Sequence, residues 1–114
     1  MDDHTTIADL RTAVQEFVSE RQWESFHNPK NLSGSIAIEA AELMEIFQWL
    51  TTEECSQTAH HPPTHRHTRE ELADVVIYCL ALANALEIDL SQAIYEKMAA
   101  NAAKYPVETS RGRL

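Results

Sequence analysis

One stretch of the chain constrains the fold more than any other: residues 75–83 read VVIYCLALA, an unbroken apolar run. On a helix this run presents apolar side chains on every side, so other elements must enclose the helix. The chain has 114 residues, of which 2 are glycine and 4 are proline. Tight turns depend on these two residue types, so their scarcity disfavours a sheet protein. We therefore expect a single all-α domain over residues 1–114.

Helical periodicity predicts four helices, which together would form a four-helix-bundle-like protomer. Polar residues that can cap a helix precede three of these segments, and Pro106 prevents the last helix from continuing. The predicted helices are 7–21 after a cap at Thr5 or Thr6, 32–50 after a cap at Asn31 or Ser33, 68–86, and 90–105 after a capping box of Asp89 and Gln92.

Two segments are predicted to lie outside the helices: residues 51–68 as a flexible linker and residues 107–114 as a polar tail. The linker contains Pro62 and Pro63 and four of the six histidines, His60, His61, His65 and His67. Such a cluster could bind a transition metal, but flanking prolines provide no rigid ligand geometry. We therefore interpret the linker as a mobile loop, which places every histidine outside the predicted helices.

The second and third helices each carry an acid-x-x-acid pair on the face that points to the core. At about 100° per residue, Glu39 lies in the middle of the apolar stripe of its helix, with Glu42 at the edge. Glu71 and Asp74 lie on the corresponding stripe of the third helix. A buried carboxylate without a partner is costly, so Glu39 must have a cation nearby or be protonated. These acids indicate a metal site, or alternatively structural acids paired with Lys or Arg.

The donor set decides which metal is expected. A di-iron site in a helical bundle uses Glu-x-x-His pairs, whereas all-oxygen ligation is typical of Mg²⁺, with Mn²⁺ as a substitute. Because no histidine falls in a predicted helix, the sequence predicts Mg²⁺. Bound by few carboxylates, Mg²⁺ keeps positions open for water and for substrate phosphate.

Other side chains have the chemistry to bind a nucleotide. Lys97, Asn101 and Lys104 share one stripe of the fourth helix and could neutralise a polyphosphate, although solvated lysines are equally common. Trp23, Trp49 and Tyr78 could stack on a base, although core packing is the more common role of each aromatic residue alone.

Five segments carry a resemblance to a known family. They are FVSERQW at 17–23, FHNPKNL at 26–32, EAAELMEIFQW at 39–49, ELADVVIY at 71–78, and KMAANAAKYPV at 97–107 with Ser-Arg-Gly at 110–112. Through them the chain resembles the all-α nucleoside triphosphate pyrophosphohydrolases of the MazG-like superfamily. The FQW and KYPV segments point to its dCTP pyrophosphatase branch.

The resemblance implies the identity of the site residues and of the assembly. The implied Mg²⁺ ligands are Glu39, Glu42, Glu71 and Asp74. The implied substrate-binding residues are Trp23, His27, Asn31, Trp49, Tyr78, Lys97, Asn101, Lys104, Tyr105 and Arg111. Val14 stands where some relatives carry a substrate-facing histidine. The family also implies a homodimer or homotetramer with sites lined by more than one subunit.

The expected reaction is metal-assisted hydrolysis between the α- and β-phosphates of a deoxynucleoside triphosphate. The expected substrate is dCTP or a 5-modified dCTP, the products are dCMP and pyrophosphate, and the implied role is nucleotide-pool sanitation. Glu42 or Glu45 is the expected general base, because both flank Glu39 and lie nearer to solvent. The alternative is a non-catalytic helical dimerisation module whose acidic residues are structural.

Charge and hydropathy exclude other classes of function. The chain has 18 acidic and 9 basic residues, a formal charge of −9, which argues against a nucleic-acid partner. The longest uncharged stretch, Val75–Leu86, is shorter than the roughly 20 residues that span a membrane. The first residues, MDDHTT, have neither the basic nor the apolar region of a secretory signal, so we expect a cytoplasmic protein.

Overall fold

The computed structural model of the chain describes residues 1–113, and every regular element in that range is a helix. The all-α prediction is therefore confirmed. Within these residues, no helix is long and apolar enough to cross a membrane. The elements are α1 (Ile7–Glu20), α2 (Pro29–Phe47), α3 (Thr52–Ser56), the 3-10 helix η1 (Thr58–His60), α4 (Pro62–Ala85), α5 (Leu90–Lys104) and α6 (Val107–Ser110).

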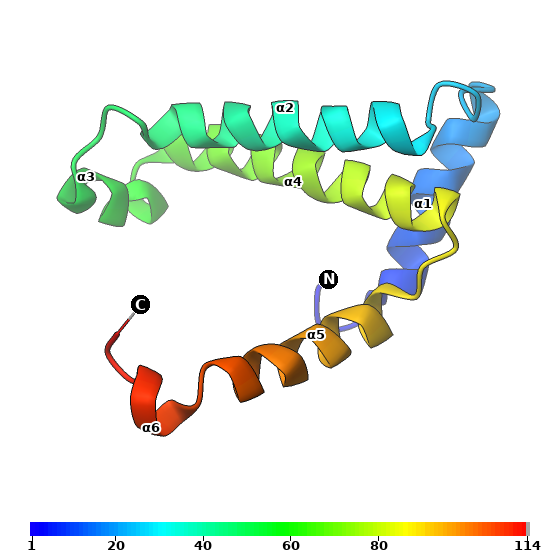
Figure 1. The fold of residues 1–114 in the computed structure, drawn as a ribbon. Coiled ribbons are helices and arrows are strands. Elements are labelled where there is room, and N and C mark those ends of the chain that lie inside the picture. The colour runs from blue at the N-terminus through cyan, green and yellow to red at the C-terminus, as the bar shows by residue number, and fades with distance from the viewer. Residues whose placement is uncertain (114) are drawn as a thin grey trace.

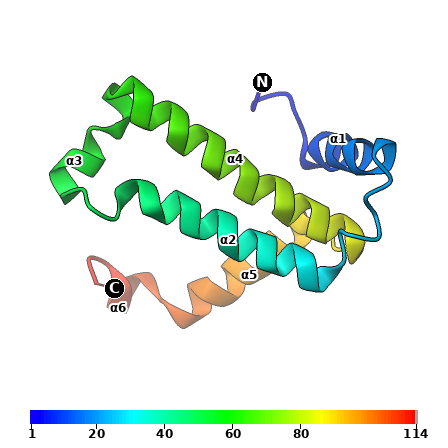
Figure 2. The same cartoon turned by 90° about the horizontal axis from the view of Figure 1, so that it is seen from above.

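The packed part of the molecule consists of α1, α2 and α4. The two long helices α2 and α4 lie side by side as an antiparallel hairpin, closed at one end by α3 and η1 (Figures 1 and 2). At the other end, α1 packs on α4. The buried hydrophobic side chains come from these three helices and are Val18, Leu32, Leu80, Ala81 and Ala83. The core therefore lies near the C-terminal half of α4.

The apolar run at 75–83 is only partly enclosed by its own chain. Leu80, Ala81 and Ala83 are buried as expected, but Val76 is 43% exposed and Ile77 is 45% exposed. The prediction that this helix is covered on every side is therefore wrong for the described part of a single chain. The face that carries Val76 and Ile77 is left open.

Arg11 fixes α1 across the C-terminal end of α4. Its Nε donates to Asn84 Oδ1 at 3.0 Å, its Nη2 donates to the Ala83 carbonyl at 3.2 Å, and its Nη1 donates to the Ile88 carbonyl. The Asn84 amide donates back to the Arg11 carbonyl at 3.0 Å. The guanidinium thus adds charge-assisted hydrogen bonds to the Ala83 carbonyl, near the end of α4, and to the Ile88 carbonyl, beyond that end, and these bonds hold α1 in place.

The fourth long helix, α5, stands apart from the other three. It runs away from the α2–α4 hairpin (Figure 1), and none of its residues is buried. The radius of gyration is 17.1 Å, whereas about 13 Å is typical of a compact domain of about 100 residues. A four-helix bundle that includes α5 is therefore not formed within residues 1–113 of one chain, and bundle formation stays a prediction.

The predicted N-terminal cap is right at α1 and wrong at α2. Thr6 caps α1 as expected, in a capping box with Asp9. However, α2 begins at Pro29 after a cap at Asn28, whose side chain accepts from the Asn31 amide at 2.9 Å. Neither Asn31 nor Ser33 is the cap, because proline is well suited to the first position of a helix, where no backbone donor is needed.

The predicted linker at 51–68 differs most from the structure, because it folds as α3, η1 and the first turns of α4. Helix α4 begins at Pro62, six residues before the predicted start, after a cap at His61. The two prolines start this helix and do not break it. His65 and His67 are therefore helical, and the prediction that every histidine lies outside the helices is wrong. The predicted polar tail contains the short helix α6.

The predicted capping box before the fourth helix is half formed. Asp89 caps α5 by accepting from the Gln92 amide at 2.9 Å. The Gln92 side chain does not complete the box, since it donates to Glu96 instead.

Candidate active site

Three of the four predicted metal ligands meet between α2 and α4. Glu39 and Glu42 on α2 and Glu71 on α4 each offer a carboxylate oxygen, and these oxygens all lie within 4.8 Å of one another. The i, i+3 spacing puts the two α2 acids on one face of the helix, and α4 presents Glu71 to that face. This acidic cluster, made of Glu39, Glu42 and Glu71, could hold a metal ion.

The electrostatics of the acidic cluster fit a cation. The Oε2 atoms of Glu39 and Glu71 are buried and have no hydrogen-bond partner. A hydrogen bond with Glu42, together with partial burial and the negative charges of Glu42 and Asp74, raises the pKa of Glu39 to about 7 from 4.5. Across residues 1–113, no Lys or Arg forms an ion pair with Glu39, Glu42, Glu71 or Asp74. The alternative of acids paired with basic side chains is therefore not what the structure shows.

The fourth predicted ligand, Asp74, lies outside the acidic cluster and lines a neighbouring pocket. This ring pocket has a volume of about 650 Å³ between α1 and α4, and its aromatic walls are Phe17, Trp23, His27 and Tyr78. The Trp23 and His27 rings stack with centroids 6.2 Å apart, and the His27 and Tyr78 rings lie 6.3 Å apart. Since Asp74 is one helical turn from Glu71, the ring pocket and the acidic cluster are adjacent along α4.

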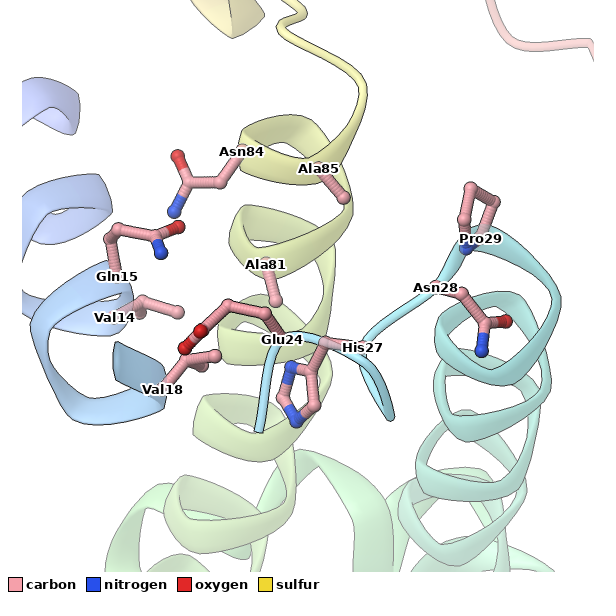
Figure 3. A pocket seen from close by; sticks show the side chains of 10 residues that line it. All are labelled: Val14, Gln15, Val18, Glu24, His27, Asn28, Pro29, Ala81, Asn84 and Ala85. Carbon is pink, nitrogen blue, oxygen red and sulfur yellow. The ribbon is translucent and has the colours of Figure 1, made fainter. Parts of the chain in front are cut away.

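A second pocket adjoins the ring pocket and shares His27, Val14 and Val18 with it. Figure 3 shows the His27 side chain on the loop between α1 and α2, with Glu24 nearby and Asn84 at the end of α4. This second pocket has a volume of about 410 Å³. His27 Nδ1 is buried without a hydrogen-bond partner, so it can accept or donate a bond to a ligand.

The predicted aromatic slot of Trp23, Trp49 and Tyr78 is not formed within one chain. Trp49 is 87% exposed and follows the end of α2, whereas Trp23 precedes its start. The 19 residues of α2 separate these ends by about 28 Å, at 1.5 Å per residue. His27 takes the place beside Trp23 and Tyr78, and substrate contact by Trp49 stays a prediction.

The predicted substrate-binding residues of the C-terminal arm lie away from both the cluster and the ring pocket. These residues lie on α5 or beyond it (Figure 1), and none of them lines a pocket described in this subsection. They are Lys97, Asn101, Lys104, Tyr105 and Arg111. Asn31 has a local contact, because its side chain donates to the Phe26 carbonyl at 3.1 Å and supports the loop before α2. The roles of Asn31 and of these five C-terminal residues in substrate binding stay predictions.

An acidic hollow of about 400 Å³ lies on the other side of the cluster from Asp74. It is lined by Glu42, Glu45, Ile46, His67 and Glu71. His67 Nε2 lies 3.5 Å from Glu71 Oε1. Sequence reasoning missed His67 because it assigned this residue to the linker. If the predicted helix had begun at Pro62, the His-x-x-x-Glu spacing would have placed His67 and Glu71 on the same face of that helix.

Comparison with known proteins gives a family match and similar relatives. The MazG-like family model matches residues 35–113. The chain is 44% identical over 107 residues to dCTP pyrophosphatase 1 of Mus musculus and 41% identical over 106 residues to that of Homo sapiens. These alignments cover 94% and 93% of this chain but 63% and 62% of the relatives, so the chain spans less than two thirds of their length.

A solved structure is similar over nearly the whole chain. The crystal structure of a pyrophosphatase from Archaeoglobus fulgidus superposes with a TM-score of 0.82 at 40% sequence identity. The match covers 90% of this chain and 94% of that protein. Both the sequence comparison and the structure comparison therefore match proteins that are named as pyrophosphatases.

Proposed function

The chain belongs to the MazG-like family, and from this membership we propose that it hydrolyses dCTP or a 5-modified dCTP to dCMP and pyrophosphate in a metal-dependent reaction. One observation carries the proposal: a cluster of three carboxylates adjoins a pocket walled by aromatic rings, with Asp74 at the pocket's edge. The similar proteins named dCTP pyrophosphatase 1 support the choice of substrate. The proposed role is nucleotide-pool sanitation.

The proposed metal ligands are Glu39, Glu42, Glu71 and Asp74. The buried, unpartnered oxygens of Glu39 and Glu71 support this assignment, because they would otherwise be left without a partner. Mg²⁺, or Mn²⁺ as a substitute, would offset the charge of the triphosphate and lower the pKa of a water molecule.

The ring pocket is proposed to bind the base. Trp23 and Tyr78 supply apolar faces, and His27 Nδ1 supplies a hydrogen-bonding atom that the protein itself leaves unpaired. With the base held there, the phosphates would extend along α4 past Asp74 toward Glu71. This direction is supported by the order of the two acids on one face of α4.

Glu45 is the proposed general base. It lines the acidic hollow beside Glu42 but is not part of the acidic cluster, so its carboxylate is free to accept a proton. In the proposed step, a water oxygen forms a bond to the α-phosphorus and gives one proton to Glu45. The bond from the α-phosphorus to the bridging oxygen breaks, pyrophosphate leaves with that oxygen, and dCMP keeps the water oxygen.

The working enzyme is proposed to be a homodimer or homotetramer. Exposed apolar side chains on α5, such as Tyr95 (75% exposed) and Met98 (60% exposed), support contact with a second copy. A second copy could also bring Trp49 or the α5 side chains Lys97, Asn101 and Lys104 to the acidic cluster, which they do not reach within one chain.

A pyrophosphate-release assay tests the proposal. The purified chain is incubated with Mg²⁺ or Mn²⁺ and with each of the four deoxynucleoside triphosphates and 5-methyl-dCTP. We expect dCTP and 5-methyl-dCTP to be hydrolysed, with purine nucleotides much poorer, because the similar proteins are named dCTP pyrophosphatase 1. Glu71→Gln should be inactive, and its exposed neighbour changed in the same way, Glu70→Gln, should be active. No release from any nucleotide would support the dimerisation module instead.

A further inference from the structure

His67 extends the line of acidic side chains by one turn of α4. It precedes Glu71 by four residues, so both side chains lie on the same face of the helix. The two also line the acidic hollow together with Glu42 and Glu45 from α2. An imidazole therefore stands at the edge of a site whose other polar groups are carboxylates.

The two oxygens of Glu71 have different surroundings. Oε2 is buried and has no hydrogen-bond partner, while Oε1 lies 3.5 Å from His67 Nε2. The side chain of Glu71 is 16% exposed and that of His67 is 58% exposed. An ordinary i, i+4 pair on a helix surface has both ends in water. Here one carboxylate connects the partly buried acidic cluster to an accessible imidazole.

The separation of 3.5 Å is informative in itself. It is longer than a normal hydrogen bond between nitrogen and oxygen, which is about 2.7–3.2 Å. Two ligands of one ion, each about 2.1 Å from it, lie about 3.0–3.4 Å apart in octahedral or tetrahedral geometry. The His67 and Glu71 atoms are therefore close to the spacing of two donors that share a metal, but His67 is not among the residues whose donor atoms all lie within 4.8 Å of one another, so a shared ion requires His67 to move toward the acidic cluster.

We propose that His67 Nε2 ligates the metal held by Glu71, so that this site has a mixed nitrogen and oxygen donor set and prefers Mn²⁺ or Co²⁺ to Mg²⁺. Imidazole suits first-row transition metals, whereas Mg²⁺ selects oxygen ligands. The inference rests on the metal site of the proposed function, and it changes the metal preference expected from carboxylates alone.

Pulsed electron paramagnetic resonance on the Mn²⁺-loaded protein tests this ligation without nucleotide. Coupling of Mn²⁺ to a ligand ¹⁴N nucleus is measured for the wild-type protein, His67→Ala and His65→Ala. His65 is the matched control. It is an exposed histidine on the same helix, but it lies about 200° from His67 around the helix axis and so faces away from Glu71. We expect the ¹⁴N coupling in the wild type and in His65→Ala, and its loss in His67→Ala.

Calorimetric titration of the same three proteins measures the metal preference. We expect His67→Ala to weaken Mn²⁺ and Co²⁺ binding by about tenfold or more, and to change Mg²⁺ binding by less than about twofold. Circular dichroism of each variant confirms that the helices are intact.

Two outcomes would overturn the role of His67 and leave the proposed function standing: Mn²⁺ binding without ¹⁴N coupling, or an equal loss of Mg²⁺ and Mn²⁺ affinity in His67→Ala. A third outcome, in which the wild-type protein binds no divalent ion, would overturn the metal site of the proposed function as well.

Discussion

Glu39 has the most unfavourable surroundings of any acid in the site, because it is half-buried beside other carboxylates. In Glu39→Gln, one negative charge is replaced by a neutral group of nearly the same shape. We expect hydrolysis to be abolished and the thermal midpoint of unfolding to stay the same or rise, since repulsion in the metal-free protein is relieved. Pyrophosphate release and thermal unfolding check this, with Glu70→Gln as the control. Near-normal activity of Glu39→Gln would contradict the ligand assignment.

The raised pKa of Glu39 predicts how stability depends on pH. The pKa is about 7 in the folded protein and 4.5 in the reference state, so between these values the folded chain binds more protons than the unfolded chain. The contribution of Glu39 to the free energy of unfolding therefore decreases as the pH rises from about 4.5 to 7, and is constant above that. Urea unfolding with a chelator at pH 5, 6, 7 and 8 measures this slope.

Glu39→Gln tests whether Glu39 causes this pH dependence of stability, because the variant lacks the titrating carboxyl group. The slope between pH 5 and pH 7 should be smaller in the variant than in the wild type. Metal binding requires the ionised carboxylate, so the increase in thermal midpoint with Mg²⁺ should be larger at pH 8 than at pH 6. An unchanged slope in Glu39→Gln would assign the pH dependence to another group.

At the scale of the elements, the Arg11 guanidinium makes three of the hydrogen bonds that hold α1 against the C-terminal end of α4. Arg11→Met keeps the length of the side chain but removes its hydrogen bonds to Asn84, Ala83 and Ile88. We expect the free energy of unfolding to fall by about 2 kcal/mol, because partly buried acceptors lose a charged donor. Urea unfolding measures the change, and Arg66→Met, at an exposed position of α4, should change it by less than about 0.5 kcal/mol. Equal losses would contradict the role of Arg11.

The helices could be predicted from the sequence where apolar spacing defines them, but their starts could not. Pro29 and Pro62 each stand at the first position of a helix, where the missing backbone donor costs nothing. The same residue inside a helix would break it, so the local sequence allows both interpretations. The early start of α4 moves His67 from a predicted loop to the edge of the acidic cluster.

The acidic cluster was more predictable than the aromatic slot of Trp23, Trp49 and Tyr78 for a physical reason. Glu39 and Glu71 interrupt apolar stripes, and a charge in such a place needs a partner whatever the details of packing. The position of Trp49 has no such constraint, because its side chain is exposed within one chain. Its role therefore depends on contacts that the spacing of residues along a helix does not specify.

At the scale of the whole molecule, the sequence indicates which faces are apolar but not which chain covers them. The run at 75–83 was expected to be enclosed, yet Val76 and Ile77 are open in one chain and α5 packs on neither α2 nor α4. Only five hydrophobic residues are buried in the described part of the chain. Periodicity is the same whether a face is covered by the same chain or by another, so assembly must be measured.

The exposed face of α5 gives a direct test of assembly. Tyr95 and Met98 lie three residues apart on one face, so the double variant Tyr95→Glu, Met98→Glu places two charges in a contact that would have to be desolvated. We expect light scattering after gel filtration to give a dimer or tetramer for the wild type and a monomer for the variant, with helical content retained. Ala100→Glu, about 140° from Tyr95 around α5, should keep the wild-type mass.

Hydrolysis should fall with the loss of assembly, because a single chain leaves Lys97 and Trp49 away from the acidic cluster. A variant that stays oligomeric would place the interface elsewhere, and a monomeric variant with full activity would show that one chain holds a complete site.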